Sequence, residues 1–104
     1  MAWVYLFVAG LFEIGWALGL KYSDGFTRPW HSLWTLVAMT LSLWCLALAI
    51  RTIPLGTGYA VWTGIGAAGT AILGMILFQE PSNPVRLASI AAIVIGIVGL
   101  KLAS

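Results

Sequence analysis

Charged residues are scarce in this sequence. Five Lys or Arg and three Asp or Glu make up 8% of its 104 residues, whereas 62% are hydrophobic. A soluble domain usually carries about 25% charged residues, so the composition excludes a typical soluble domain and indicates an integral membrane protein. The net charge of +2 comes from cations scattered along the chain. Because they form no basic tract, we expect no nucleic-acid partner.

The residues that most often carry metal or nucleophilic chemistry are almost missing. Cys45 is the only cysteine and His31 the only histidine, so neither a disulfide framework nor a thiolate metal site can form. The sequence has no metal-ligand spacing, no Ser/His/Asp arrangement and no phosphate-binding glycine loop. We therefore expect no metal, no cofactor and no enzymatic activity.

Long apolar runs are what the sequence does contain, and short polar turns separate them. The runs predict helices over about residues 2–20, 32–50, 55–78 and 85–102, each close to the roughly 30 Å needed to cross a bilayer. The first run has no positive segment before it and is long for a signal peptide, so we expect a retained helix. The predicted fold is all-α: one domain over residues 1–104 with four transmembrane helices and both termini on one side of the membrane.

Glu13 lies in the middle of the first apolar run. An ionised carboxylate at that depth is costly, so such residues usually face a bundle interior or a watery cavity and have a function. The alternative is a protonated Glu13 that makes a structural hydrogen bond between helices. In either case Glu13 needs polar groups from other helices around it.

Candidate neighbours of Glu13 come from three helices. Helical spacing places small residues such as Gly10 on one side of Glu13 and the indole of Trp16 on the other. Ser42 lies near the middle of the second helix, where its hydroxyl could donate to Glu13 or bond to its own helix. In the third helix one face carries aromatic and polar groups that can attract a cation or donate hydrogen bonds: Tyr59, Trp62, Thr63 and Gly66.

Small residues suggest where helices bend or meet. Gly64 and Gly66 form a tight pair that predicts either a hinge in the third helix or plain close packing. In the fourth helix Ser89, Ala92 and Gly96 share one face, and the four-residue step between small residues lets two helices approach closely. This face is a candidate dimer contact.

Positive charges are nearly balanced between the two sides of the predicted helices. The side with the termini has Arg51, Lys101 and the terminal amine, and the other side has Lys21, Arg28 and Arg86. Since Lys/Arg asymmetry in short loops sets membrane orientation, the chain carries weak orientation signals and could insert both ways. Ordinary scatter in charge placement explains the balance equally well. Two oppositely inserted copies would supply the inverted repeat that many transporters use.

The chain resembles the small multidrug resistance family. The resemblance lies in Glu13 followed by Trp16, in the Gly-Tyr-Ala-Val-Trp-Thr-Gly-Ile-Gly stretch at 58–66, and in the length of four helices. Gly10, Trp16, Ser42 and Lys101 are similar to the guanidinium-exporter subtype. Ser89 departs from the pattern, because a glycine is familiar at that position.

The resemblance implies an antiparallel, dual-topology homodimer in the cell membrane of a prokaryote that exchanges protons for guanidinium. Glu13 of both subunits would bind the cation or protons, and the Gly64–Gly66 segment would flex. The site would be shaped and supported by Trp16, Ser42, Tyr59, Trp62, Gly10 and Thr63. For Lys101 we expect a structural role, either anchoring at the membrane interface or dimer packing. Two carboxylates that face one cavity repel each other when ionised, so protons and cations would compete for them.

Three other functions are open on the sequence. A multidrug exporter for quaternary ammonium cations would need a greasier site, because its substrates lack N–H donors. A channel usually has rings of polar or charged groups along a pore, and this chain has one carboxylate at mid-membrane depth. A small membrane subunit could use Glu13 to hold a partner helix.

Overall fold

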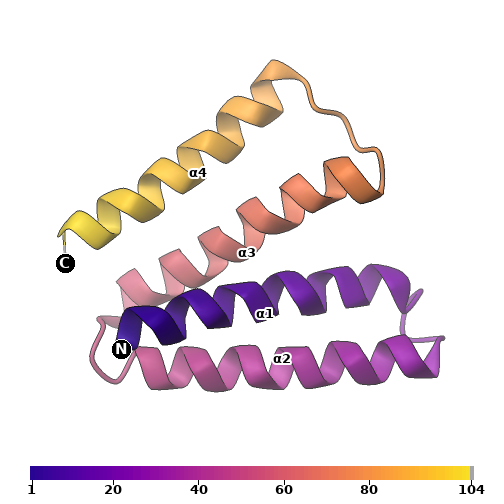
Figure 1. Ribbon diagram of the computed structural model, residues 1–104, viewed down its shortest axis with the longest axis horizontal. Coiled ribbons are helices and arrows are strands. Elements are labelled where there is room, and N and C mark those ends of the chain that lie inside the picture. The colour runs from indigo at the N-terminus through magenta and orange to yellow at the C-terminus, as the bar shows by residue number, and fades with distance from the viewer. Residues whose placement is uncertain (104) are drawn as a thin grey trace.

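The computed structural model describes residues 1–103, and within that range the chain forms four α-helices. These are α1 (Ala2–Tyr22), α2 (Pro29–Ala49), α3 (Leu55–Leu77) and α4 (Pro84–Ala103). All four described helices are long and apolar enough to cross a membrane, which confirms the predicted fold class. Both ends of the chain lie at the same end of the helix array (Figure 1), which we call the terminal end. The α1–α2 and α3–α4 loops form the opposite end, the loop end.

The helix boundaries differ from the expected ones most clearly at the start of α2. This helix begins at Pro29 and not near residue 32, because proline has its φ preset for the first helical turn and lacks an N–H that would be unpaired there anyway. α1 ends at Tyr22 and is capped by Ser23, whose N–H donates to the Gly19 carbonyl at 2.8 Å. The Ser23 hydroxyl accepts from the Phe26 N–H at 3.2 Å. These bonds make the α1–α2 connection a compact turn.

The helices lie side by side in a flat array in the order α2, α1, α3, α4 (Figure 1). α1 packs against α2, which runs antiparallel to it, and against α3, which runs parallel to it. α4 packs along α3 and diverges from it towards the loop end. The whole subunit measures 41 × 35 × 17 Å, so it is little more than one helix thick. Such a layer cannot enclose a polar path by itself.

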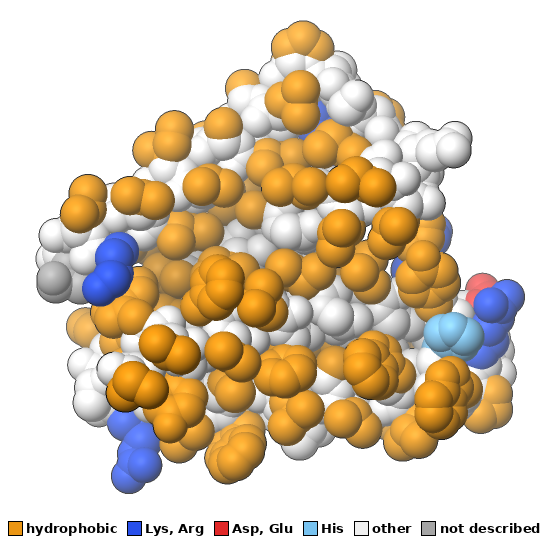
Figure 2. Space-filling view, viewed as in Figure 1, with side chains coloured by type: hydrophobic (Ala, Val, Ile, Leu, Met, Phe, Trp, Pro, Cys, Tyr) orange, Lys and Arg blue, Asp and Glu red, His pale blue; other side chains and the backbone are white. Residues whose placement is uncertain are grey.

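The buried core lies in the terminal half of α1, α2 and α3. It is a single cluster of Leu6, Ala9, Leu46, Ala49, Ile53, Val61 and Trp62. Most apolar side chains outside it are exposed, and Figure 2 shows them covering the visible face while charged side chains lie towards its ends. This distribution suits lipid around the helices and water at both ends.

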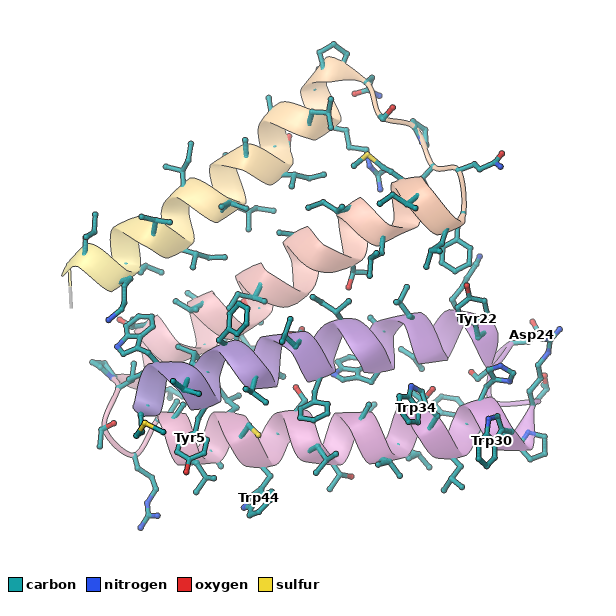
Figure 3. The ribbon with its side chains drawn as sticks, viewed as in Figure 1. Tyr5, Tyr22, Asp24, Trp30, Trp34 and Trp44 are labelled. Carbon is teal, nitrogen blue, oxygen red and sulfur yellow. The ribbon has the colours of Figure 1, made fainter. Side chains whose placement is uncertain are left out.

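Tryptophans line the outside of α2. Trp30 and Trp34, near the start of the helix, are 74% and 61% exposed. Trp44 is also exposed and points away from α1 (Figure 3). Trp3 is partly buried at the start of α1.

Candidate functional site

Glu13 lies at the contact between α1 and α3. Its carboxyl group rests directly on the backbone of Gly66, so closely that a Cβ at position 66 would overlap the carboxyl carbon and Oε2. One turn earlier, Gly10 meets Ile65 in the same way, since a Cβ at Gly10 would come within 2.5 Å of the Ile65 Cγ2. Glycine at both positions therefore lets the parallel helices approach, and at Gly66 it makes room for the carboxylate.

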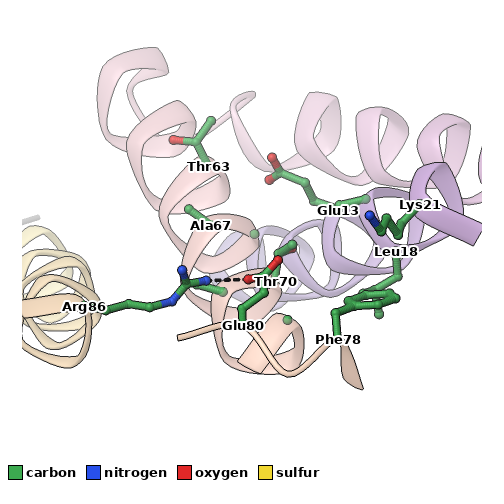
Figure 4. Close-up of a pocket in the computed structure, with 13 residues that line it drawn as sticks. Glu13, Leu18, Lys21, Thr63, Ala67, Thr70, Phe78, Glu80 and Arg86 are labelled. Carbon is green, nitrogen blue, oxygen red and sulfur yellow. Dashed lines mark hydrogen bonds and ion pairs between the residues drawn. The ribbon is translucent and has the colours of Figure 1, made fainter. Parts of the chain in front are cut away.

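A cleft of about 660 Å³ opens beside Glu13 (Figure 4). It runs along α1 and α3 from Glu13 to the loop end, where charged groups of the α1 terminus and of the α3–α4 loop surround its mouth. The residues that line it are Glu13, Ala17, Leu18, Lys21, Thr63, Gly66, Ala67, Thr70, Ala71, Gly74, Phe78, Glu80 and Arg86. Of the predicted site residues, the structure thus brings Glu13, Thr63 and Gly66 together in one cavity.

Two polar side-chain atoms of α1 have no hydrogen-bond partner within the described part of the subunit. They are Glu13 Oε2 and the indole Nε1 of Trp16, and both are buried. A buried polar group without a partner costs about 1–3 kcal/mol. The site is therefore chemically incomplete in a single subunit and has the capacity to bind a cation, a proton or a group from another chain.

The structure contradicts the hypothesis that Ser42 donates to Glu13. Its hydroxyl proton goes to the Ala9 carbonyl at 2.7 Å, and its oxygen accepts the Trp62 Nε1–H at 2.9 Å. A hydroxyl has one proton to donate, so this network leaves none for Glu13. Ser42 is completely buried and links all three core helices one turn from the contact between Glu13 and Gly66.

Trp62 and Tyr59 lie next to each other but outside the cleft. The Trp62 ring belongs to the buried core and is 7% exposed, and its N–H is used by Ser42. The Tyr59 ring packs against it edge-on, with 5.4 Å between ring centroids, and is 54% exposed. In the isolated subunit neither ring reaches the Glu13 cavity. Trp16 likewise does not line the cleft.

The predicted hinge lies in an uninterrupted helix. α3 is helical throughout Leu55–Leu77, and both glycines have packing neighbours. A Cβ on Gly64 would come within 3.0 Å of the Ile97 Cδ1 of α4, and Gly66 supports Glu13. These contacts give close packing a direct physical basis, and the hinge stays a prediction.

Lys101 lies far from Glu13, at the terminal end. Its Nζ is 4.6 Å from the centroid of the Trp3 ring, a cation–π contact between the last turn of α4 and the first turn of α1. An apolar cavity of about 320 Å³ between these helices and α3 borders both residues. Lys101 therefore supports the position of α4 and does not contribute to the central site of its own subunit.

The small-residue face of α4 is uncovered. Ser89, Ala92 and Gly96 are exposed, and a Cβ on Gly96 would meet no atom within 4 Å. The Ser89 hydroxyl donates to the Val85 carbonyl of its own helix at 2.8 Å. This face is available for another helix, and its role as a dimer contact stays a prediction.

Sequence reasoning missed several residues of the cleft wall and its mouth. Ala67, Thr70 and Ala71 continue the polar and small face that begins at Thr63, and the three- and four-residue spacing of that face could have revealed them. Glu80 lies in the α3–α4 loop and Arg86 in the first turn of α4. No spacing rule along one helix connects the two residues. The described residues contain no group of three or more His, Cys, Asp or Glu that could hold a metal ion.

Four helices long enough to span a membrane, with one carboxylate at mid-depth between α1 and α3, define a small integral membrane protein, and comparison with known sequences assigns it to a family. Residues 1–93 match the family model described as Small Multidrug Resistance protein, so the chain belongs to the small multidrug resistance family, whose members are membrane transporters and not enzymes.

Curated relatives resemble the chain along its whole length. A protein of Proteus vulgaris named guanidinium exporter is 59% identical over 104 residues, which cover 100% of both chains. Proteins with the same name from Yersinia pestis and Escherichia coli strain K12 are 57% and 55% identical, with all of this chain and 100% and 99% of theirs covered. This chain is accordingly a multi-pass membrane protein of a bacterial type.

Proposed function

We propose that this protein exports guanidinium in exchange for protons across the cell membrane. The observation that carries the proposal is the Glu13 carboxylate at the inner end of the cleft, held against Gly66 and with Oε2 unpaired. A carboxylate in an apolar span binds either a proton or a cation to neutralise its charge. The shared name of the similar proteins, guanidinium exporter, supports the choice of cation.

The cleft chemistry favours guanidinium over quaternary ammonium cations. Guanidinium is planar, and its N–H groups can pair with a carboxylate in a bidentate fashion. Thr63 and Thr70 also line the cleft, and threonine hydroxyl groups can accept hydrogen bonds. A quaternary ammonium ion has no N–H to offer to any of these groups. A guanidinium ion bound here gains several directed contacts that such a cation does not.

The functional unit in this proposal is an antiparallel dimer. A subunit 17 Å thick in its shortest dimension leaves the cleft open on one side, and a second copy would close it and bring a second Glu13 to the cavity. The exposed small-residue face of α4 offers a contact for that copy. The balanced cations at the two ends of the helices support insertion in both orientations.

In the proposed cycle each loaded dimer exposes its site to one side of the membrane at a time. Guanidinium leaves when protons take its place on the two Glu13 carboxylates, and protons leave when guanidinium binds. Both ions need the same carboxylates, and the dimer changes access only when it is loaded, so neither ion is carried independently and a proton gradient drives export of the cation. Trp16, Tyr59 and Trp62 would come to the site from the packing of two subunits, with Ser42 holding Trp62 in place.

Exchange in proteoliposomes tests this function. With guanidinium on one side and an imposed pH gradient, the protein should move protons against guanidinium, and Glu13→Gln should abolish this exchange because the amide can neither ionise nor pair with the cation. Glu13→Asp should retain part of the activity with a changed pH dependence. A pH-sensitive dye inside the vesicles measures the proton flux.

Asp24→Asn is the matched control, since Asp24 is an exposed carboxylate of the α1–α2 loop, and it should leave exchange intact. Full proton-coupled uptake by Glu13→Gln would overturn the proposal. Equal exchange of guanidinium and tetraphenylphosphonium by the unaltered protein would favour the multidrug alternative.

A further inference from the structure

An ion pair that the sequence did not suggest borders the mouth of the Glu13 cleft. At the loop end the cleft is bordered by Lys21, Phe78, Glu80 and Arg86. Arg86 Nη2 donates to Glu80 Oε1 at 2.5 Å (Figure 4), and Lys21 Nζ lies 5.7 Å from the centroid of the Phe78 ring. The mouth thus has two cations and one carboxylate, and that carboxylate is occupied by a guanidinium group of the protein itself.

The pair can open without disturbing the backbone on either side. The side chains of Arg86 and Glu80 are 31% and 44% exposed, and the bond between them joins one nitrogen to one oxygen. Each residue is also held independently: the Glu80 N–H donates to the Gly74 carbonyl at 3.3 Å, and the Arg86 N–H donates to Asn83 Oδ1 at 2.9 Å. Ion pairs this exposed contribute little to stability and exchange readily.

Arg86 presents to Glu80 the same chemical group as the proposed substrate. A free guanidinium ion that arrives at the mouth can make every bond to Glu80 that Arg86 makes, and it can also pair with both carboxylate oxygens. Without an exposed carboxylate at this position, Lys21 and Arg86 would repel an approaching cation. Glu80 is the one carboxylate among the residues that line the mouth; it attracts the cation, and Arg86 competes for it.

We propose that Glu80 is an outer docking site for guanidinium on its path to Glu13, and that Arg86 is the intramolecular competitor that this cation displaces. The inference rests on the proposed function of the Glu13 cleft and adds a second binding step to it. When Arg86 is displaced, its side chain leaves the mouth and the cation can pass along the wall formed by Thr70 and Thr63 to Glu13. When the cation has moved on, Arg86 returns to Glu80.

This arrangement predicts effects of opposite sign for the two partners. In guanidinium exchange by reconstituted protein, Glu80→Gln should lower kcat/KM roughly fivefold with kcat nearly unchanged, because capture is impaired while the central site is intact. Arg86→Gln should raise kcat/KM by about the same factor, because it frees Glu80. If the pair only fastens the loop, both variants would change kcat/KM in the same direction, and that result would overturn the inference.

The double variant separates docking from simple repulsion. With Arg86→Gln already present, adding Glu80→Gln should still lower kcat/KM at least fivefold, since the carboxylate is then freely available to the cation. If Glu80→Gln had no effect in the Arg86→Gln background, its effect as a single substitution would come from the unpaired Arg86. That result would overturn the inference. Glu80→Asp keeps the carboxylate, so its kcat/KM should lie much closer to that of the unaltered protein than the kcat/KM of Glu80→Gln does.

Two loop residues supply matched controls. Asp24 and Arg28 are exposed at the same end of the subunit, but neither lines the cleft. Asp24→Asn and Arg28→Gln repeat the charge changes and should leave kcat/KM unchanged; equal effects there would reduce Glu80 and Arg86 to general surface charges. Absence of guanidinium exchange by the unaltered protein would instead refute the proposed function, so the two failures are distinguishable.

Discussion

At the scale of single residues, Glu13 and Ser42 are two polar side chains near the middle of apolar helices, and they differ in their hydrogen-bond partners. Glu13 could be identified from the sequence because a carboxylate in an apolar helix is conspicuous whatever surrounds it. Ser42 was also recognised as a polar residue at mid-depth, with Glu13 or its own helix as alternative partners, and the structure shows neither. Two groups close by, the Ala9 carbonyl and the Trp62 indole, use its hydroxyl completely. Choosing among possible partners within 3 Å requires the packing of three helices, and no spacing rule along one helix supplies it.

This network makes Ser42 a positioning residue with a measurable effect on stability. Ser42→Ala leaves the Trp62 N–H without its acceptor and the Ala9 carbonyl without its donor. We expect a loss of about 1–2 kcal/mol in the free energy of unfolding in detergent, with a fall in guanidinium affinity as Trp62 loses its fixed orientation.

The matched control for this variant is Thr40→Val. The Thr40 hydroxyl donates to the Leu36 carbonyl of its own helix at 2.9 Å, on the exposed side of α2, and its removal should change stability by less than 0.5 kcal/mol, within the ordinary range for surface substitutions. Equal losses for both variants would contradict the role assigned to the buried network. A changed tryptophan fluorescence spectrum in Ser42→Ala alone would support it.

At the scale of helices, the α1–α3 contact explains what the glycines of α3 do. The sequence indicated a hinge or close packing at Gly64 and Gly66, and the structure adds that each faces a different helix, Gly64 facing Ile97 of α4 and Gly66 facing Glu13 of α1. Since the two are two residues apart, they lie on different sides of α3. A movement of this segment would therefore be felt by the carboxylate and by α4 together.

Gly66→Ala should change the position of the Glu13 side chain and leave the stability of the fold nearly unchanged. The added Cβ overlaps the end of a flexible side chain, so Glu13 can rotate away while α1 and α3 stay in contact. We expect little change in the unfolding temperature and a loss of about tenfold in guanidinium affinity, equivalent to one charge-assisted hydrogen bond. Isothermal titration of detergent-solubilised protein measures the affinity.

Gly10→Ala and Gly56→Ala are the comparison variants for Gly66→Ala. At Gly10 the new Cβ meets Ile65 Cβ at 2.7 Å, an atom fixed to the backbone, so the helices must move apart and stability should fall. At Gly56 nothing lies within 4 Å, and affinity and stability should both persist. Unaltered affinity in Gly66→Ala would show that the contact with Glu13 is dispensable for binding.

At the scale of the whole molecule, the shape of the chain suits the proposed dimer. Its helices form one layer, its cleft is open, and α4 extends from the array with most of its surface exposed. An isolated four-helix chain could have closed into a bundle, but here α4 stays beside α3. The fold thus preserves a free helix with small residues on one face, as a dimer contact requires.

Gly96→Leu should prevent the proposed dimer from forming. A leucine at the centre of the small-residue face holds two α4 helices apart by the width of its side chain, so cross-linking in membranes and guanidinium exchange should both fall by at least about tenfold. Ala91→Leu places the same side chain on another exposed face of α4 and should be tolerated. Normal cross-linking of Gly96→Leu would move the interface to a different surface.

The sequence by itself determined the class of this protein. Four apolar runs of the right length dictate four membrane-spanning helices, because an uninterrupted helix is what pairs every backbone group inside lipid. The apolar character of these runs also marks Glu13 as a functional residue, because a carboxylate inside a membrane span is costly. These properties depend on neighbours along the chain, which the sequence records directly.

Only the tertiary structure decided which groups meet. It placed Gly66 under the Glu13 carboxylate, gave the Ser42 hydroxyl to Ala9 and Trp62, set the Lys101 ammonium over the Trp3 ring, and joined Glu80 to Arg86 at the mouth of the cleft. The physical reason is that short-range contacts between different helices depend on the rotation and offset of each helix. Many side chains of similar polarity share each helix face, and packing alone selects among them.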